Sequence, residues 1–426
     1  MAQSNPNVII SIFLHLTKEM PDRFQRLRRW SYGSVIVVIM LLTRPRRLCD
    51  YSSVFLTLKF DAPKLFGDKK APAKSTFSDA RGKVSIEVFR WLLEQVSKLA
   101  GRMRSSRLTK KSRRFFAVDG VNLVVPSSKE LRQSCERPKY NSWLRAHYPQ
   151  AKVLVAFDVL RRVPLEFTML AKGIGERAGL SSLYQFFKPR DVIIMDRGFP
   201  ARWLLRELVE KKLDVVMRMT CKKCGSFPEV KDFIASGKRS CVLNMRLDKD
   251  TSITVRLLRK NFRVGRPKRH QRVETMVVLT TLPASEFSDE EIFELYGRRW
   301  GIETLFREMK HSFAIERFHA RTLLGIQQEI SAILLWSGLA SVIQIAVESQ
   351  IPSNRRAMRT LCLEATDRLV IAILTGDDPG GMMGLLILEI RRHAYTPQED
   401  RSFPRECKRP WGRWAKKSKK RNHWYS

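Results

Sequence analysis

The sequence predicts an α/β fold, with a mixed sheet in the middle of the chain and helical regions before and after it. Two observations lead to this prediction. Helical periodicity runs through residues 1–105 and returns in the last third of the chain, whereas short apolar runs of strand length, several ending on an aspartate, fill the middle. A chain of 426 residues is long enough for two or three domains with their own cores.

Residues 1–105 are predicted to form a helical domain. Amphipathic segments cover residues 8–18, 24–42 and 84–99, and a stretch rich in Pro, Lys and Gly at 61–74 interrupts them. Ser75–Arg81 offers a helix start followed by a basic face. A small DNA-binding domain fits this pattern, but any other helical bundle would give the same one, so both interpretations stay open.

Residues 106–219 carry the predicted strands. Apolar runs at 115–120, 152–159 and 163–170 indicate three hairpin-like strands. A helix at 179–187, a strand ending at Asp196, a helix at 201–211 and a strand at 213–219 then follow in that order. This order matches a ribonuclease-H-like core, and acids at strand ends are where open sheets of this type place their chemistry.

The rest of the chain continues the core after an interruption. Residues 220–285 alternate in the manner of strands and are predicted to form a β-rich insertion subdomain. Residues 286–345 complete the core with one long helix, which begins after Ser288 as N-cap, and with an apolar helical stretch from about 322 to 347. Residues 346–426 form a C-terminal helical region with a basic, Trp-containing tail.

The charge of the chain points to a polyanionic partner. Lys and Arg number 79 against 42 acids, which gives a net charge of +37 and a pI near 10.4. Nucleic acid is the first expectation, with an anionic membrane as the competing interpretation. The apolar run Val35–Leu42 is too short to span a bilayer and is expected to be a buried helix. The N-terminus lacks the pattern of a signal peptide, so a cytoplasmic protein with reduced cysteines is expected.

The predicted helix after Ser288 carries a second face beside its apolar one. At about 100° per residue, Tyr296, Arg299, Glu303 and Lys310 fall within an arc of roughly 60°. The apolar residues Ile302, Leu305, Phe306, Met309 and Phe313 centre on a neighbouring arc about 90° away. A solvated face with incidental ion pairs is the simplest explanation, but Tyr296 and Trp300 add aromatic area that a solvated face does not need.

A lone carboxylate among cations suits a divalent metal at a phosphodiester. Two metal ions need several carboxylates that converge from different elements. Glu303 supplies one, and Asp119 and Asp196, each at the end of a strand predicted to be central, are the natural others. Asp158 also ends an apolar strand, but it lies at the turn of a basic hairpin and is judged a decoy; Asp191, which opens its strand, is discounted as well.

These residues resemble a known family. The pattern Tyr296-x2-Arg299-x3-Glu303-x6-Lys310 is similar, residue for residue, to the Tyr-Arg-Glu-Lys signature of bacterial DDE insertion-sequence transposases. Asp196–Phe199, with the sequence DRGF, resembles the second-aspartate motif of that family, and the strand Phe115–Gly120 resembles the first. The resemblance covers about residues 75–345 and, more loosely, the basic tail.

The resemblance implies cut-and-paste transposition on a ribonuclease-H-like core. Asp119, Asp196 and Glu303 would bind two Mg²⁺ ions, for which Mn²⁺ can substitute, and the freed 3′-hydroxyl would attack target DNA. Tyr296, Arg299 and Lys310 would contact phosphates near the transposon end, with Trp300 beside them. The partners would be the terminal inverted repeats and target DNA, held by a homodimer at the nucleoid of a bacterium.

Further motifs allow two interpretations each. Val264–Arg272 is a basic turn whose Arg266, Lys268 and Arg269 resemble a minor-groove hook, although a solvated turn fits as well. The insertion has no tryptophan to stack on a flipped base, and Met276 lies near the corresponding place. Cys221 and Cys224, with Cys241 and His270, could be zinc ligands or free thiols. The glycines of residues 172–179 have the wrong spacing for nucleotide binding and indicate a flexible entry to a helix.

The leading hypothesis is therefore a DNA transposase. A ribonuclease-H-like nuclease that cuts without integrating is the first alternative, and a domesticated DNA-binding regulator with an idle active site is the second. Because all three acids are present, the sequence argues against the regulator.

Overall fold

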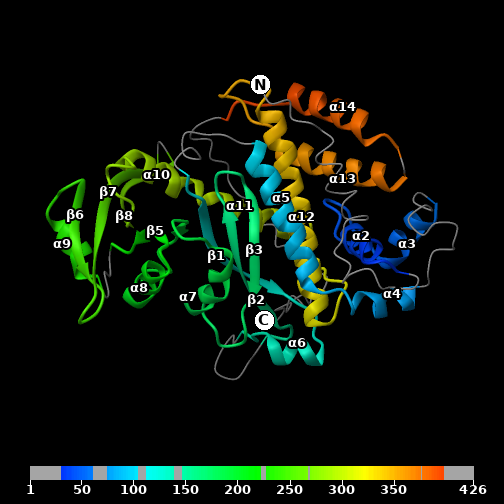
Figure 1. The fold of residues 1–426 in the computed structure, drawn as a ribbon, viewed down its shortest axis with the longest axis horizontal. Helices are drawn as coiled ribbons and strands as arrows, with labels where there is room; N and C mark the ends of the chain where they lie inside the picture. Colours follow the sequence, from blue (N-terminus) through cyan, green and yellow to red (C-terminus); the bar gives the residue numbers. More distant parts are fainter. Residues whose placement is uncertain are drawn as a thin grey trace, which may run out of the picture.

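A computed structural model shows one large mixed sheet with helices on both faces (Figure 1). It describes residues 30–60, 74–103, 112–138, 146–221, 227–266, 269–375 and 377–397. The predicted helix at 8–18, the interruption at 61–74 except its last residue, and the basic tail lie outside this part.

The sheet has eight strands in the order β3-β2-β1-β4-β5-β8-β7-β6. The strands are β1 (Phe115–Val124), β2 (Gln150–Asp158), β3 (Val163–Met169), β4 (Val192–Met195), β5 (Asp214–Met219), β6 (Ser240–Arg246), β7 (Ser252–Arg266) and β8 (Arg269–Thr280). β1, β2 and β3 are antiparallel neighbours, and β4 and β5 run parallel to β1. The five strands predicted between residues 115 and 219 are therefore confirmed, with boundaries that differ by a few residues.

The predicted insertion is β-rich, as expected, but its strands continue the main sheet. β8 pairs antiparallel with β5 over Val216–Met219, and β7 and β6 follow it outward. The β7–β8 hairpin is longer than its contact with β5, so most of it extends past the core at the left of Figure 1. The physical reason is that β5 is an edge strand until β8 covers its free backbone groups.

Short helices connect the strands. One face of the sheet is covered by α7 (Glu176–Gly179), the 3₁₀-helix η4 (Leu180–Phe186), α8 (Arg202–Glu210) and α9 (Pro228–Ala235), whereas α6 (Lys129–Ser134) contacts α12 on the other face. The helix predicted at 179–187 is thus mainly a 3₁₀ segment, whereas the helix predicted at 201–211 is α8. Buried apolar residues of η4 and α8 pack on Phe116, Val118, Ile193 and Met195 of the sheet.

The other face is covered by a helical layer built around α12 (Leu323–Glu348). Side chains from the described N-terminal helices, from α12 and from the C-terminal helices belong to one buried cluster with this face of the sheet. The remaining helices are α2 (Tyr32–Leu42), α3 (Tyr51–Phe60), α4 (Lys74–Arg81), α5 (Ile86–Met103), α10 (Asp289–Arg298), α11 (Trp300–His311), α13 (Arg359–Thr375) and α14 (Pro379–Arg392). α5 lies along α12, as Figure 1 shows.

α12 is apolar on all sides because it is enclosed on all sides. Among the described residues it is the one helix long and apolar enough to cross a membrane, and its apolar window is fully buried inside the protein. The shorter apolar run that the sequence analysis singled out is α2, which is buried as expected, with Ser31 as N-cap. The Trp336 indole of α12 donates to the backbone of Met40 over 3.1 Å, so the two apolar helices are joined by a buried hydrogen bond.

Candidate active site

The register of the two central parallel strands brings two aspartates together. β1 and β4 pair Phe115 with Val192 and Ala117 with Ile194, where the pairing ends; continued by two residues, this register brings Asp119 beside Asp196, and the two carboxylates are close enough for the charge of Asp196 to act on Asp119. Side chains alternate along a strand, and Ala117 and Ile194 both face the helical layer of α12. Both aspartates therefore face that layer, at the end of the sheet where β4 stops.

The DRGF motif explains how Asp196 is held. The Gly198 amide donates to the Asp196 carboxylate over 2.7 Å, and a Cβ at Gly198 would lie 2.9 Å from the same oxygen. Phe199 is 1% exposed and anchors the turn in the core on the other face of the sheet. The structure thus explains three positions of the motif: Asp196 supplies the carboxylate, Gly198 leaves room for it, and Phe199 anchors the turn in the core.

Glu303 reaches the same place from the helical layer. The sequence predicts one long helix through residues 288–310, but the structure has two, α10 and α11, that meet at Arg299. The Arg299 amide bonds to the Tyr296 carbonyl, a tighter turn than an α-helix makes. α11 then packs closely on β2, because a Cβ at Gly301 would lie 2.8 Å from the Phe157 ring. This approach presents Glu303 to the face that carries Asp119.

Arg299 joins two of the three acids. Its guanidinium donates to Asp119 over 3.3 Å and to Glu303 over 2.5 Å. The residue is 5% exposed and stacks between Tyr296 and Trp300, with its guanidinium carbon 5.7 and 5.6 Å from the two ring centres. We call these two hydrogen bonds the Arg299 bridge. They show that residues 119 and 303, far apart in the sequence, lie within the span of one guanidinium.

The electrostatics of Asp119 are those of an incompletely paired acid. Burial raises the pKa of Asp119 to about 6, and the nearby Asp196 carboxylate adds to the rise. The Gly120 amide, which donates to Asp119 over 2.9 Å, and the Arg299 charge oppose the rise without cancelling it. A further cation near Asp119 would therefore stabilise its ionised form.

Glu176 is a fourth acid at this place, and the sequence analysis missed it. Its carboxylate lies over Gly120, where an added Cβ would be 2.4 Å from Glu176 Oε1. Burial and Asp196 raise the pKa of Glu176, against the charge of Lys152. Glu176 opens α7, in the glycine-containing segment that was interpreted as a flexible entry to a helix. That interpretation fits the segment, but the acid at the helix start was the overlooked signal.

Arg218 was also missed and lies next to Asp196. β4 and β5 pair Ile194 with Val216, so Asp196 and Arg218 stand opposite each other on the same face. Arg218 is half-buried, and its side chain has no hydrogen bond or ion pair to any residue that the structure describes. Arg218 and the exposed Arg197 line a cavity of about 480 Å³ that ends at Val273 and Thr275 of β8. Arg218 could have been predicted from the alternation of side chains along the two neighbouring strands, which puts Arg218 on the same face as Asp196.

The remaining predicted residues of the signature face differ in exposure. Tyr296 is 3% exposed and packs in the core, so contact of its side chain with a phosphate would need a change in the surrounding structure. Trp300 is 56% exposed. Lys310 donates to the Asn122 carbonyl of β1 over 2.9 Å and keeps about a third of its side chain accessible. Met276 of β8 is half-buried against the helical layer.

The other predicted residues can be placed only in part. Arg266 and Arg269 pair at the tip of the β7–β8 hairpin, but their side chains are outside the described part, as is Lys268. Cys224 is outside it too. The Cys221 thiol lies 3.5 Å from the Thr275 carbonyl. The two decoys behave as expected: Asp158 accepts from Leu160 and Arg161 at the β2–β3 turn, and Asp191 pairs with Arg114.

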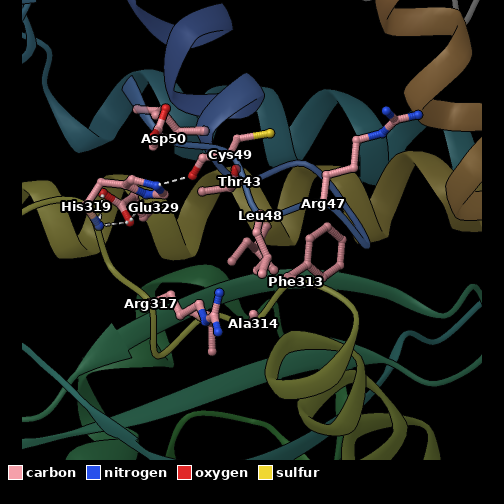
Figure 2. A pocket seen from close by; sticks show the side chains of 13 residues that line it. Thr43, Arg47, Leu48, Cys49, Asp50, Phe313, Ala314, Arg317, His319 and Glu329 are labelled. Atoms are coloured by element: carbon pink, nitrogen blue, oxygen red, sulfur yellow. Dashed lines mark hydrogen bonds and ion pairs between the residues drawn. The ribbon is translucent and has the colours of Figure 1, made fainter. Parts of the chain in front are cut away.

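A second cavity, of about 230 Å³, lies between the loop after α2 and the loop after α11 (Figure 2). His319 and Glu329 form part of its wall and are joined to each other, and the His319 ring also bonds to the Cys49 carbonyl. None of the acids discussed above lines this cavity. The place where Asp119 of β1 and Asp196 after β4 lie is therefore the better candidate for chemistry.

The acids fit a divalent cation in chemistry but not in their present arrangement. Carboxylate oxygens are the ligands that Mg²⁺ and Mn²⁺ prefer. Among the described residues, however, no group of three or more His, Cys, Asp or Glu side chains is placed to hold a metal ion. In this arrangement the Arg299 guanidinium is bonded to both Asp119 and Glu303.

Comparison with known proteins identifies the family of the chain. The family described as transposase DDE domain matches residues 110–337, more than half of the chain, and this range contains Asp119, Asp196 and Glu303. No curated protein matches. A solved structure, a piggyBac transposase synaptic complex with hairpin DNA, is similar over 93% of this chain and 84% of that one, with 11% identity and a TM-score of 0.43. The chain thus belongs to the transposase DDE domain family, whose members are DNA-cleaving enzymes.

Proposed function

We propose that this transposase cuts DNA at transposon ends and joins the freed 3′ ends to target DNA, on a ribonuclease-H-like core. The observation that carries the proposal is that Asp119 of β1 interacts with two acids from other elements, with Asp196 after β4 directly and with Glu303 of α11 through Arg299. A site of this kind suits phosphodiester chemistry, which needs converging carboxylates.

Asp119, Asp196 and Glu303 are the residues that would hold Mg²⁺ or Mn²⁺. When bound, such ions activate a water and stabilise the leaving oxygen. In hydrolysis the water oxygen bonds to phosphorus and the bond to the 3′ oxygen breaks, which leaves a 3′-hydroxyl. In strand transfer that hydroxyl attacks a target phosphorus and releases a target 3′-hydroxyl. Both steps exchange one phosphate ester bond without an external energy source.

The chain's own cations would position the DNA backbone. Arg218 and Arg197 extend the site from Asp196 towards β8, and Lys310 extends it along β1. These side chains, together with Arg299, suit phosphates on either side of the cut. Trp300 offers an exposed aromatic surface for a base or sugar. We retain Tyr296 as a support for Arg299 and, after rearrangement, as a phosphate contact.

Residues farther from the acids complete the proposal. The hairpin tip with Arg266, Lys268 and Arg269 would reach a neighbouring groove. Met276 would occupy the place of a base-stacking residue, so a hairpin intermediate is an open step rather than a required one. A homodimer would hold two inverted repeats, at the nucleoid of a bacterial cytoplasm. The net charge of +37 suits binding of two DNA segments at once.

Glu303→Gln tests the assignment. It removes a ligand charge but leaves the DNA surface, so cleavage of a donor plasmid carrying the DNA that flanks the gene should fall by a factor of about a thousand or more. That factor is a loss of several kcal/mol, at about 1.4 kcal/mol per tenfold. Binding to the same DNA in a gel-shift assay should persist.

Glu294→Gln, the same change at an exposed acid of α10, is the matched control and should cleave normally. Normal cleavage by Glu303→Gln would refute the assignment. Cleavage without joined products in the wild type would favour the nuclease, and binding without cleavage would favour the regulator.

A further inference from the structure

The Arg299 bridge places a cation where the proposed chemistry requires a metal. Arg299 donates to Asp119 and to Glu303, so its positive charge partly compensates two of the three acids. Within the described chain these acids and Asp196 do not form a metal-holding group. A guanidinium and a divalent ion cannot share this space without strong repulsion.

The Arg299 bridge is also an incomplete set of bonds. Arg299 Nε is buried and has no hydrogen-bond partner, although the residue is 5% exposed. A guanidinium carries five donors in a planar fork, which a phosphate can satisfy in a bidentate manner. Two further cations belong to neighbouring positions of the sheet: Arg218 follows the last residue that pairs β5 with β4, and Lys310 donates to the carbonyl of Asn122, three residues after Asp119 on β1. A phosphate that reaches Asp119 and Glu303 would meet Arg299 as the cation bonded to both.

We propose that Arg299 keeps the carboxylates of the DNA-free protein from binding a divalent cation, and that a DNA phosphate draws Arg299 away and opens the metal site. This inference rests on the proposed function and adds a regulation to it. Only molecules in which Arg299 has left the acids can bind the metal. The apparent metal affinity of the free protein is therefore the intrinsic affinity multiplied by the fraction of such molecules. Metal loading and DNA binding then promote each other, because linkage between two sites is reciprocal. The protein consequently does not carry a loaded metal site when no DNA is bound.

The test is Mn²⁺ binding to the full-length protein without DNA, with free Mn²⁺ followed by electron paramagnetic resonance. The wild type should bind weakly at this site, and Arg299→Ala should bind about tenfold more tightly or better, because the competing cation is gone. Arg298→Ala, a change at the neighbouring, partly exposed arginine that pairs with Glu294, is the matched control and should behave as the wild type. Equal Mn²⁺ affinity in Arg299→Ala and the wild type would overturn the proposal.

Two further variants keep the outcome interpretable. Arg299→Lys can neutralise one acid but cannot donate to both in a fork, so its affinity should lie between those of the wild type and Arg299→Ala. It serves if Arg299→Ala fails to fold, as judged by circular dichroism. Adding Asp119→Asn to Arg299→Ala should remove the gained affinity. If the gain survives in the double variant, the acids are not the metal site and the proposed function fails; if Asp119→Asn weakens Mn²⁺ binding but Arg299→Ala changes nothing, only the Arg299 inference fails.

Discussion

Two buried arginines bond to carboxylates in this molecule, and the pKa values of those carboxylates shift in opposite directions. Arg81 of α4 is 6% exposed and donates to Glu329 of α12 over 3.0 Å. Arg299 is 5% exposed and forms the Arg299 bridge. The pKa of Glu329 is lowered to about 2: burial alone would raise it, but the Arg81 charge and the hydrogen bonds and charge of His319 outweigh burial. The pKa of Asp119 is raised to about 6, mainly by burial.

The difference lies in how completely each acid is bonded. Glu329 accepts the backbone amides of His319 and Ala320 as well as Arg81, and Gln328 holds the other side of the same guanidinium. Asp119 has one amide, one contact of 3.3 Å to Arg299 and a second carboxylate opposite. A fully bonded carboxylate fixes α4 on the core, whereas a partly bonded one is available to a ligand. Similar residue types thus serve structure in one place and chemistry in another.

The largest expected effect is a difference between the two arginines in how much each contributes to the free energy of unfolding. Arg81→Met leaves Glu329 buried without its counter-charge and should lower the free energy of unfolding by about 3–5 kcal/mol. Arg299→Met should lower it by about 1 kcal/mol or less, because Glu303 is one-third exposed and partly screened by water. Urea unfolding followed by circular dichroism measures both. Equal losses would mean that the Arg299 bridge is as structural as the Arg81 cluster.

Asp119→Asn should raise stability while it abolishes cleavage. At pH 7.5 the native protein holds Asp119 ionised against a pKa of about 6, and relief of that cost should be worth about 2 kcal/mol. Asp158→Asn is the contrasting variant: its carboxylate accepts two amides and Arg161 at the β2–β3 turn, so stability should fall by about 1–3 kcal/mol. A loss of stability in Asp119→Asn would show that Asp119 is a structural acid like Asp158.

The two acids should also respond to pH in opposite directions. Asp119 has a folded-state pKa above its usual 3.8, so the native state binds this proton more tightly; the advantage of Asp119→Asn should be full above pH 6 and fade towards pH 4. Glu329 has a folded-state pKa below its usual 4.5, so the stability it contributes should be full above about pH 4.5 and be lost towards pH 2. Unfolding free energies of Asp119→Asn and Glu329→Gln, each relative to the wild type across pH, check both windows.

Much of the strand order could be predicted from sequence, because it depends on local patterns. The apolar runs indicated β1 to β5, and Asp196 directly follows β4 as predicted. Asp119 was predicted to end its strand, but β1 continues past it to Val124, because residues 120–124 pair with β2. The structure adds the register, which brings a residue inside β1 close to the residue after β4. Helical angle also gave the packing side of α11, where Ile302 and Met309 are buried.

What the sequence could not give depends on tertiary contacts. Tyr296 was placed on an open face by angle, yet the break at Arg299 and the packing of α10 bury it. Glu176 comes from a short helix whose position is set by tertiary contacts, among them the close approach of Glu176 to Gly120 and of Gly179 to Leu170. The packing of α2 and α5 on α12 could not be read from amphipathic patterns, because a separate helical domain would show the same ones.

The smallest expected effect asks whether Arg299 leaves the acids once DNA is bound. If it moves to one phosphate, Arg299→Ala should reduce the slope of log affinity against log salt by about one, and Arg299→Lys should keep the wild-type slope because the slope counts charges. Filter-binding assays of the gene-flanking DNA from low to moderate salt measure this. An unchanged slope in Arg299→Ala would leave Arg299 paired with Asp119 and Glu303 in the complex. Arg81 and Arg299 would then differ only in how completely their acids are bonded. Opening of the metal site would need a different trigger.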